Sequence, residues 1–253
     1  MNSNEVVALV TGGASGLGEA SVRSIVSNGG KVLILDLNVP SGEVLAKEFP
    51  QSVKFVKTDV TDADSVQSGI DLCLTEFGLI NTVVNCAGIA VVEKTIGKDG
   101  AHSLAEFEKA ININITGSFN VSRLAALAME NNKPFSGGER GIIINTASVA
   151  AYDGQKGQVA YAASKGGVAA MTLPMARDLA QVGIRVMAIA PGLFMTPMLA
   201  GLPTKTLEVL STQPLFPNRL GTPQEYGDLV IFIIKAGYLN AEVIRLDGGI
   251  RLP

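Results

Sequence analysis

The chain has 253 residues, of which 47% are hydrophobic and 17% are charged, and its net charge is −3. This length suits one large α/β domain with a sizeable core, and the scattered Lys and Arg residues argue against nucleic acid as a partner. No apolar run approaches the ~18 residues that a membrane-spanning helix needs, so we expect no membrane partner.

Side chains that bind metals are sparse. The chain has two cysteines, Cys73 and Cys86, and a single histidine, His102. These predict no metal site and argue against a Ser/His/Asp triad. A glycine-rich turn that begins at Thr11 leaves no room for a signal peptide, so we expect a cytoplasmic protein with reduced thiols, with a mitochondrial location as the alternative.

The first predicted strand runs straight into that glycine-rich turn. Val6–Thr11 is rich in β-branched residues, the glycines at 12, 16 and 18 follow it, and Glu19–Asn28 is helical in composition. Glycines let a backbone approach a pyrophosphate whose charge faces the N-terminus of a helix. The turn therefore predicts a dinucleotide site, with a tight turn that needs positive φ as the alternative.

Asp36 ends the next apolar run, Lys31–Leu35. It lies eighteen residues after Gly18, where a dinucleotide-binding unit carries the acid that binds the ribose hydroxyls. Its charge repels the additional phosphate of NADP, and no Arg or Lys in the glycine turn or directly after Asp36 offsets it. We therefore predict NAD as the cofactor, with an Asp that caps a turn as the alternative.

Strand and helix patterns continue to alternate in the following residues. Val53–Val56 is a predicted strand, followed by Asp59 and Val60 in the position of a loop over the adenine, and Thr82–Val84 is the next predicted strand. Between them, Asp62–Phe77 predicts an amphipathic helix, whose inner side consists of Val66, Ile70, Cys73, Leu74 and Phe77. The alternation predicts a Rossmann-like, doubly wound parallel sheet of about seven strands with helices on both faces.

Asparagines interrupt the following long helix. The polar stretch Glu93–His102 predicts a surface loop, and Ser103 with Glu106 predicts a capping box before a helix that reaches Met129. Asn112 and Asn114 lie inside this helix. Because asparagine is a poor helix former, we expect at least one of them to distort the helix or bind water.

A candidate acid and base lies further along the chain. Ser148 follows the predicted strand Gly141–Thr146, and Tyr161 and Lys165 stand four residues apart in the predicted helix Val159–Gln181. The spacing places both side chains on one helix face. A neighbouring ammonium favours the phenolate, so we expect Lys165 to lower the pKa of Tyr161 and make it an acid and base for an alcohol or a ketone. The alternative is a chance pair on a helix surface.

Residues 193–221 are largely apolar and contain four prolines. This 193–221 segment predicts a lid over the apolar arm of a small-molecule substrate. The candidate lid side chains are Leu193, Phe194, Met195, Met198, Leu199 and Leu202, and core packing is the alternative for about half of them. A helix, Gln224–Ala236, and a strand, Val243–Leu246, complete a single domain, 1–253, whose dinucleotide-binding part is about 1–150.

Together these motifs resemble the short-chain dehydrogenases/reductases. The resemblance covers essentially the whole chain and rests on Thr11–Gly18, Asn85–Gly88, Asn114, Ser148, Tyr161 with Lys165, and Pro191-Gly192. It implies an NAD-dependent oxidoreductase that interconverts a secondary alcohol and a ketone, with Tyr161 as general acid/base and Ser148 orienting the substrate oxygen. Lys165 would lower the tyrosine pKa and hold the nicotinamide ribose, and Asn114 would support a water that links Lys165 to solvent.

The resemblance also implies the cofactor contacts and the assembly. The contacts would be Gly12, Ser15, Leu17, Gly18, Asp36, Asp59, Val60, Asn85, Gly88, Tyr161, Lys165 and Thr196. A homotetramer is implied, in which the helices that begin near Ser103 and Val159 pack against partner subunits.

Within the family, four stretches are similar to the branch that acts on L-3-hydroxyacyl-CoA. They are NCAGIAV, RGIIINTASVAAYDGQKGQVAYAASKGG, MARDLAQVGIRVMAIAPGLF and EVIRLDGGIR. The alternatives are an NADH-dependent carbonyl or ketone reductase, a hydroxysteroid dehydrogenase and, in a different class, a non-catalytic NAD-binding subunit. The presence of Ser148, Tyr161 and Lys165 favours an enzyme.

Overall fold

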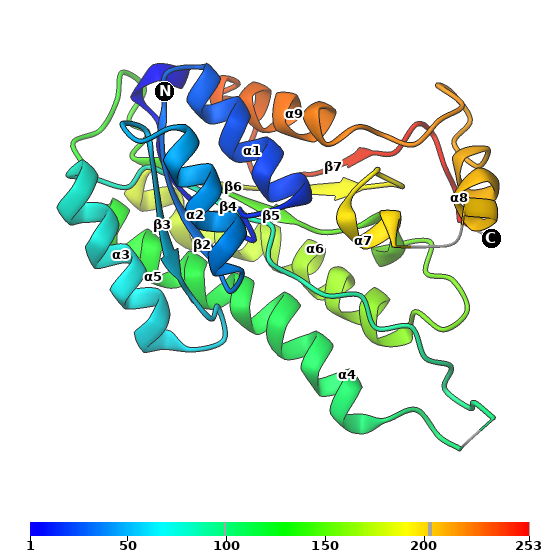
Figure 1. Cartoon of the computed structure of the whole chain (residues 1–253). Coiled ribbons are helices and arrows are strands. Elements are labelled where there is room, and N and C mark those ends of the chain that lie inside the picture. The colour runs from blue at the N-terminus through cyan, green and yellow to red at the C-terminus, as the bar shows by residue number, and fades with distance from the viewer. Residues whose placement is uncertain (99, 202–203, 253) are drawn as a thin grey trace.

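A computed structural model describes residues 1–98, 100–201 and 204–252. Its centre is one parallel sheet of seven strands in the order β3-β2-β1-β4-β5-β6-β7 (Figure 1). The strands are β1 Val7–Thr11, β2 Lys31–Asp36, β3 Val53–Lys57, β4 Thr82–Asn85, β5 Gly141–Thr146, β6 Ile184–Pro191 and β7 Val243–Leu246. The strand order reverses direction between β1 and β4, and a doubly wound sheet binds its ligand at such a point. The predicted fold is confirmed.

Helices cover both faces of this sheet. They are α1 Gly16–Ser27, α2 Val39–Glu48, α3 Ala63–Phe77, α4 Leu104–Ile111, α5 Ser118–Glu130, α6 Val159–Leu179, α7 Pro197–Ala200, α8 Thr204–Ser211 and α9 Pro223–Lys235. The short helical turns are η1 Ser3–Glu5, the π-helix η2 Asn112–Gly117, η3 Val149–Ala151 and η4 Ala180–Val182. Helices α7 and α8 lie beyond the carboxyl ends of β6 and β7 (Figure 1). None of the helices in the described residues is both long and apolar enough to cross a membrane.

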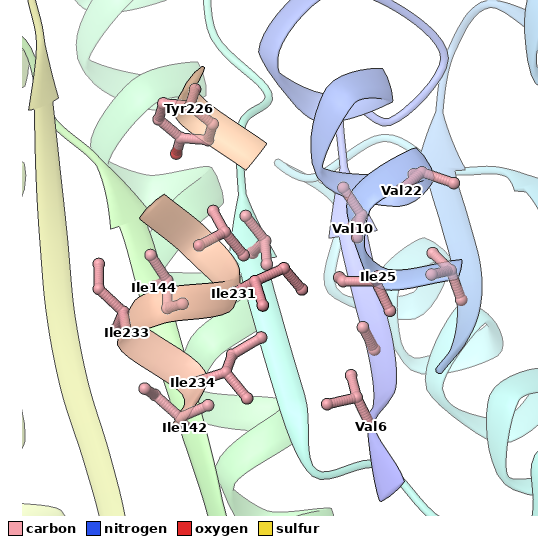
Figure 2. Packing of buried hydrophobic residues seen from close by; sticks show 14 of the residues in the cluster. Val6, Val10, Val22, Ile25, Ile142, Ile144, Tyr226, Ile231, Ile233 and Ile234 are labelled. Atoms are coloured by element: carbon pink, nitrogen blue, oxygen red, sulfur yellow. The ribbon is translucent and has the colours of Figure 1, made fainter. Parts of the chain in front are cut away.

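Alternate strand residues pack into two separate cores. On one face, Val10 and Ile144 pack with residues of α1 and α9, and Figure 2 shows the isoleucines of α9 beside those of β5. On the other face, Leu9 and Ile143 pack with residues of α3, α5 and α6. The central strands β1, β4, β5 and β6 are buried along their whole length, as expected for a parallel sheet, whereas the edge strands β3 and β7 are partly exposed.

The first half of the chain differs from the sequence predictions in three respects. Helix α1 begins at Gly16 rather than Glu19, so the last glycines of the turn already belong to its first turn. Helix α2 was not predicted, because Pro40 and Gly42 disfavour helix in its interior. Pro40 is tolerated in the first turn, and a Cβ at Gly42 would collide with the Phe55 ring. Leu74, predicted to face inward, is 36% exposed.

The helix expected from Ser103 to Met129 is divided. The Ser103 side chain accepts a hydrogen bond from the Glu106 amide, but the Ser103 amide donates to Glu93 of the preceding loop at 2.9 Å, so the predicted capping box is only half formed. Between α4 and α5, the π-helix η2 contains both asparagines. The expected distortion of the helix is confirmed, and π-turns of this kind often occur at functional sites.

Candidate active site

The glycine turn is too close to its neighbours for side chains. Gly12 has a φ of +62°, and a Cβ there would lie 2.8 Å from the amide nitrogen of Ala87. A Cβ at Gly18 would collide with the Gly12 carbonyl oxygen. The Thr11 hydroxyl accepts hydrogen bonds from the amides of Cys86 and Ala87, each at 3.1 Å. The carboxyl ends of β1 and β4 are thereby held together under the turn.

The start of α1 fits the pyrophosphate of a dinucleotide. Ser15 is its N-cap, is exposed, and within the described residues makes no capping hydrogen bond with its side chain. The first amides of the helix therefore remain available to an anion, which the helix dipole also favours. Gly12 and Gly18 leave the backbone bare beside them, so the residues present fit the phosphate groups of a nicotinamide dinucleotide.

Asp36 lies over the same turn. One carboxylate oxygen accepts a hydrogen bond from the Ala14 amide at 3.0 Å, and the other accepts from the Asn38 amide at 2.9 Å. These bonds fix the carboxylate at the carboxyl end of β2, beside the phosphate cradle. The position is that expected for the acid that binds the ribose hydroxyls.

Asp59 and Val60 follow β3 at the carboxyl end of the strand. Asp59 is exposed, whereas Val60 is buried. The Asn120 side-chain amide of α5 donates to the Val60 carbonyl at 2.9 Å, and a Cβ at Gly117 would lie 2.6 Å from the Val60 side chain. Asn120 therefore fixes the predicted adenine loop. Sequence inspection missed it because its partner lies sixty residues away.

Asn114 joins three segments of the site. Its side-chain oxygen accepts from the Ile89 amide and its nitrogen donates to the Ile89 carbonyl, both at 2.9 Å. The same nitrogen donates to the Ser164 hydroxyl at 2.8 Å. A Cβ at Gly88 would lie 3.0 Å from the Asn114 oxygen and 3.6 Å from Lys165 Nζ. Asn114 and Gly88 thus lie beside α6, the helix that carries Tyr161 and Lys165.

Ser148, Tyr161 and Lys165 meet at the carboxyl end of β5. Ser148 is the N-cap of η3, directly after the strand, and its hydroxyl accepts from the Ala150 amide at 3.1 Å. Lys165 Nζ lies 5.9 Å from the centre of the Tyr161 ring and donates to the Thr146 carbonyl at 2.6 Å. The structure brings together the three side chains that the sequence singled out.

The electrostatics of this group differ from the sequence expectation. Burial raises the pKa of Tyr161 above its usual value, and the nearby Ser148 hydroxyl acts in the opposite direction. Burial also lowers the pKa of Lys165 to about 8. In the protein alone the tyrosine pKa therefore moves opposite to the predicted decrease, because desolvation of the phenol exceeds the effect of the Ser148 hydrogen bond.

Asn85 is fully engaged by the protein. Its side-chain nitrogen donates to the Ser118 carbonyl, the Ser122 hydroxyl and the Asn145 side chain, at 2.9–3.3 Å. Its side-chain oxygen accepts from the Thr11 hydroxyl at 3.4 Å. The side chain thus joins β1, β4, β5 and α5 beneath the predicted cofactor site.

Thr146 and Tyr226 complete the floor of the site, and sequence inspection missed both. Thr146 gives its hydroxyl proton to the Asn85 carbonyl at 2.6 Å, so the Tyr226 phenol must donate to Thr146 across 2.7 Å. The Thr146 carbonyl in turn holds Lys165. Thr146 could have been found from the sequence, because it lies two residues before Ser148. Tyr226 could not, because it lies in α9, eighty residues later in the chain.

The 193–221 segment is only partly exposed. Phe194 is 6% exposed and belongs to the core, so it is not a lid side chain, whereas Met195 is 46% exposed. Leu193 and Leu199 are half-buried. Leu202 lies outside the described residues, as does the side chain of Met198. Thr196 is the N-cap of α7, and a Cβ at Gly16 would lie 3.5 Å from its Cβ, which places Thr196 against the glycine turn.

Comparison with known proteins identifies the family. The family model described as short chain dehydrogenase matches residues 6–206. The chain is a short-chain dehydrogenase. It is 54% identical to the 3-hydroxyacyl-CoA dehydrogenase type-2 of Bos taurus over an alignment of 249 residues. This alignment covers 98% of this chain and 95% of the bovine protein. The Homo sapiens protein of the same name is 52% identical over the same shares of both chains.

A solved structure shows the same fold and family. The crystal structure of 3-hydroxyacyl-CoA dehydrogenase type-2 from Mycobacterium avium has a TM-score of 0.93 and 41% sequence identity, and covers 98% of this chain and 96% of that one. The chain is therefore an oxidoreductase that uses a nicotinamide cofactor. The enzyme class expected from the sequence is confirmed.

Proposed function

We propose that this short-chain dehydrogenase interconverts L-3-hydroxyacyl-CoA and 3-oxoacyl-CoA with NAD. The observation that carries the proposal is that Ser148, Tyr161 and Lys165 lie together. The glycine turn, whose Ala14 amide donates a hydrogen bond to Asp36, lies in the same site. A phenol, a hydroxyl and an ammonium at the end of a dinucleotide cradle suit the chemistry of a secondary alcohol. The names of the similar proteins supply the substrate class.

The side chains divide the proton chemistry among them. A bound nicotinamide dinucleotide would supply or accept the hydride. Tyr161 would give its proton to the substrate oxygen in reduction and take it back in oxidation, while Ser148 donates a hydrogen bond that holds this oxygen in place. Lys165 would hold its ammonium beside the phenol and the cofactor ribose, anchored by the Thr146 carbonyl.

NAD rather than NADP follows from the charge at the end of β2. Asp36 is held over the turn by two amide donors, so its carboxylate cannot turn away without losing both bonds. A phosphate on the adenosine ribose would meet this negative charge, whereas free hydroxyls would donate to it.

The substrate side offers both apolar and basic groups. Met195 is exposed next to Thr196, which lies against the glycine turn, and as a proposed lid the 193–221 segment would contact an acyl chain. A cavity of about 420 Å³ borders the loop between Ser148 and Tyr161 and includes Lys94 and Lys156 in its lining. Two ammonium groups in the lining of this cavity would suit the phosphates of CoA. Lys98 and Lys205 are exposed.

The test is the initial rate of NADH oxidation with acetoacetyl-CoA, compared with acetoacetate, a small panel of free ketones and a ketosteroid. Each substrate is tried with NADH and with NADPH. We expect acetoacetyl-CoA with NADH to give the highest kcat/KM by at least about tenfold, equal to about 1.4 kcal/mol. Turnover confined to free ketones or to the ketosteroid would retain the mechanism and reject the acyl-CoA substrate.

We also propose that the enzyme is a homotetramer. Leu104, Phe119 and Leu127 of α4 and α5 are 48–69% exposed, and Val159 and Leu173 of α6 are 45% and 42% exposed. Exposed apolar side chains on neighbouring helices suit a subunit interface. Sedimentation equilibrium tests the proposal: four times the monomer mass is expected, and a monomer at micromolar concentration would reject it.

A further inference from the structure

The C-terminal strand carries an arginine between two carboxylates. Arg245 of β7 donates from Nη2 to Asp153 at 2.6 Å and from Nε to Asp247 at 2.8 Å. Its Nη2 also donates to the Ile250 carbonyl at 3.0 Å, and its guanidinium lies 5.6 Å from the centre of the Tyr152 ring. The sequence analysis gave none of these residues a function.

We call Arg245 with Asp153 and Asp247 the clamp. Its Asp153 end belongs to the loop between Ser148 and Tyr161, called here the catalytic loop. Ser148 caps η3, and the Asp153 amide donates to the Val149 carbonyl of that turn at 2.8 Å. A single helical turn therefore separates Asp153 from the Ser148 hydroxyl. A shift of Asp153 is transmitted to Ser148 through a short hydrogen-bonded unit rather than through a flexible loop.

The Asp247 end belongs to a turn that supports the 193–221 segment. Asp247 accepts from the Gly249 amide at 2.9 Å, and the neighbouring Gly248 carbonyl accepts from the Phe216 amide at 3.1 Å. A Cβ at Gly192 would lie 2.8 Å from the Asp247 Cα. The C-terminal turn thus packs against both ends of the apolar segment that follows β6.

The clamp is shielded enough to constrain its partners. The side chains of Arg245, Asp153 and Asp247 are 23%, 17% and 9% exposed. The guanidinium fits this geometry because its separate nitrogens point in fixed, different directions, Nη2 toward Asp153 and Nε toward Asp247. Arg251 also binds Asp247, at 3.2 Å, but its side chain is 64% exposed, and its hydrogen bonds are to Asp247 and Ile250.

We propose that Arg245 is a positioning residue for Ser148. Arg245 joins the catalytic loop to the C-terminal turn at Asp247, and thereby holds the Ser148 hydroxyl at the substrate oxygen. It also fixes the position of this turn, which supports the 193–221 segment, relative to the catalytic loop. The inference rests on the proposed role of Ser148 and on no particular substrate.

The test compares Arg245→Met with the matched control Arg251→Met, and repeats Arg245→Met in a Ser148→Ala background. We expect Arg245→Met to lower kcat about tenfold and Arg251→Met to change it less than about twofold, with the Kd for NADH altered less than about twofold in both. In the Ser148→Ala background, Arg245→Met should change kcat less than about twofold, since residues that act as one unit are not additive.

The same tenfold decrease with and without Ser148, or equal effects of Arg245→Met and Arg251→Met, would overturn the proposal. A parallel loss of NADH binding would also overturn it, because it would mark a general structural defect. If Arg245→Met does not fold, Arg245→Lys serves in its place, with a smaller loss of kcat that again vanishes in the Ser148→Ala background. All rates are taken with whichever ketone the wild type reduces fastest, so the result does not depend on the acyl-CoA proposal.

Discussion

The cofactor side and the substrate side of the candidate active site are built in different ways. On the side of β1 and β2, backbone and short side chains define the surface: the glycine turn leaves no room for a Cβ, and Asp36 is fixed by two amides. On the side beyond β6, the 193–221 segment carries apolar side chains, of which Met195, Val209 of α8, Leu215 and Phe216 are exposed. The first construction suits one invariant ligand, whereas the second can vary with the substrate.

Among the changes that distinguish these two sides, the largest effect is expected on the cofactor side, whose surface is made of backbone. Gly18→Ala should weaken NADH binding at least about 100-fold, equal to about 2.7 kcal/mol, because the new Cβ collides with the Gly12 carbonyl and displaces the turn. Fluorescence titration measures the Kd. Gly237→Ala is the control, since a Cβ there meets no atom within 4 Å among the described residues; equal Kd values in the two variants would contradict the tight cradle.

A charge change on the same side should have a smaller effect. Asp36→Asn should raise the Kd for NADH about tenfold and narrow the preference over NADPH, because the charged acceptor of the ribose hydroxyls becomes a neutral one, a loss of about 1.4 kcal/mol. Asp64→Asn, an exposed carboxylate in the first turn of α3, is the control. An unchanged ratio of the NADH and NADPH affinities would show that Asp36 does not select the cofactor.

Between the two sides, proton transfer should depend on pH in opposite senses for the two reaction directions. Burial raises the pKa of Tyr161, so the phenol is protonated at neutral pH in the free enzyme. Reduction requires this protonated form and oxidation requires the phenolate. From about pH 6 to about pH 9, kcat/KM for oxidation should rise about tenfold per pH unit, because the phenolate fraction rises by that factor below the pKa, and kcat/KM for reduction should not rise. Profiles that rise in parallel would contradict Tyr161 as the shared acid and base.

The smallest effect is expected on the apolar side. Met195→Ser should reduce kcat/KM for a long-chain 3-oxoacyl-CoA about threefold more than for acetoacetyl-CoA, since a half-exposed side chain contributes about 1 kcal/mol of apolar contact. Val44→Ser, on α2 far along the cofactor side and 67% exposed, should show no such difference between chain lengths. An equal loss for both substrates would place the acyl chain elsewhere.

The features that could be predicted from the sequence are those that neighbouring residues define. The glycine turn, Asp36 and the Tyr161–Lys165 spacing were predictable, because each is defined by neighbours within one strand-turn-helix unit or one helix turn. The direction of the Tyr161 pKa was not, since burial comes from segments throughout the chain.

Contacts between distant segments were equally out of reach. Tyr226 meets Thr146 across eighty residues and Arg245 meets Asp153 across ninety-two, so no local pattern indicated them. Helix α2 was missed for the opposite reason, because its local composition opposes the helix that packing against Phe55 stabilises.

The most direct test of the account is the Tyr161→Phe variant, assayed for NADH binding and for ketone reduction in the same preparation. The phenyl ring keeps the shape of the site and removes only the hydroxyl that carries the proton. The account predicts a Kd for NADH within about twofold of wild type and a kcat lower by about 10³-fold, within the range for general acid–base catalysis. A variant that retains a tenth or more of the wild-type kcat would contradict it.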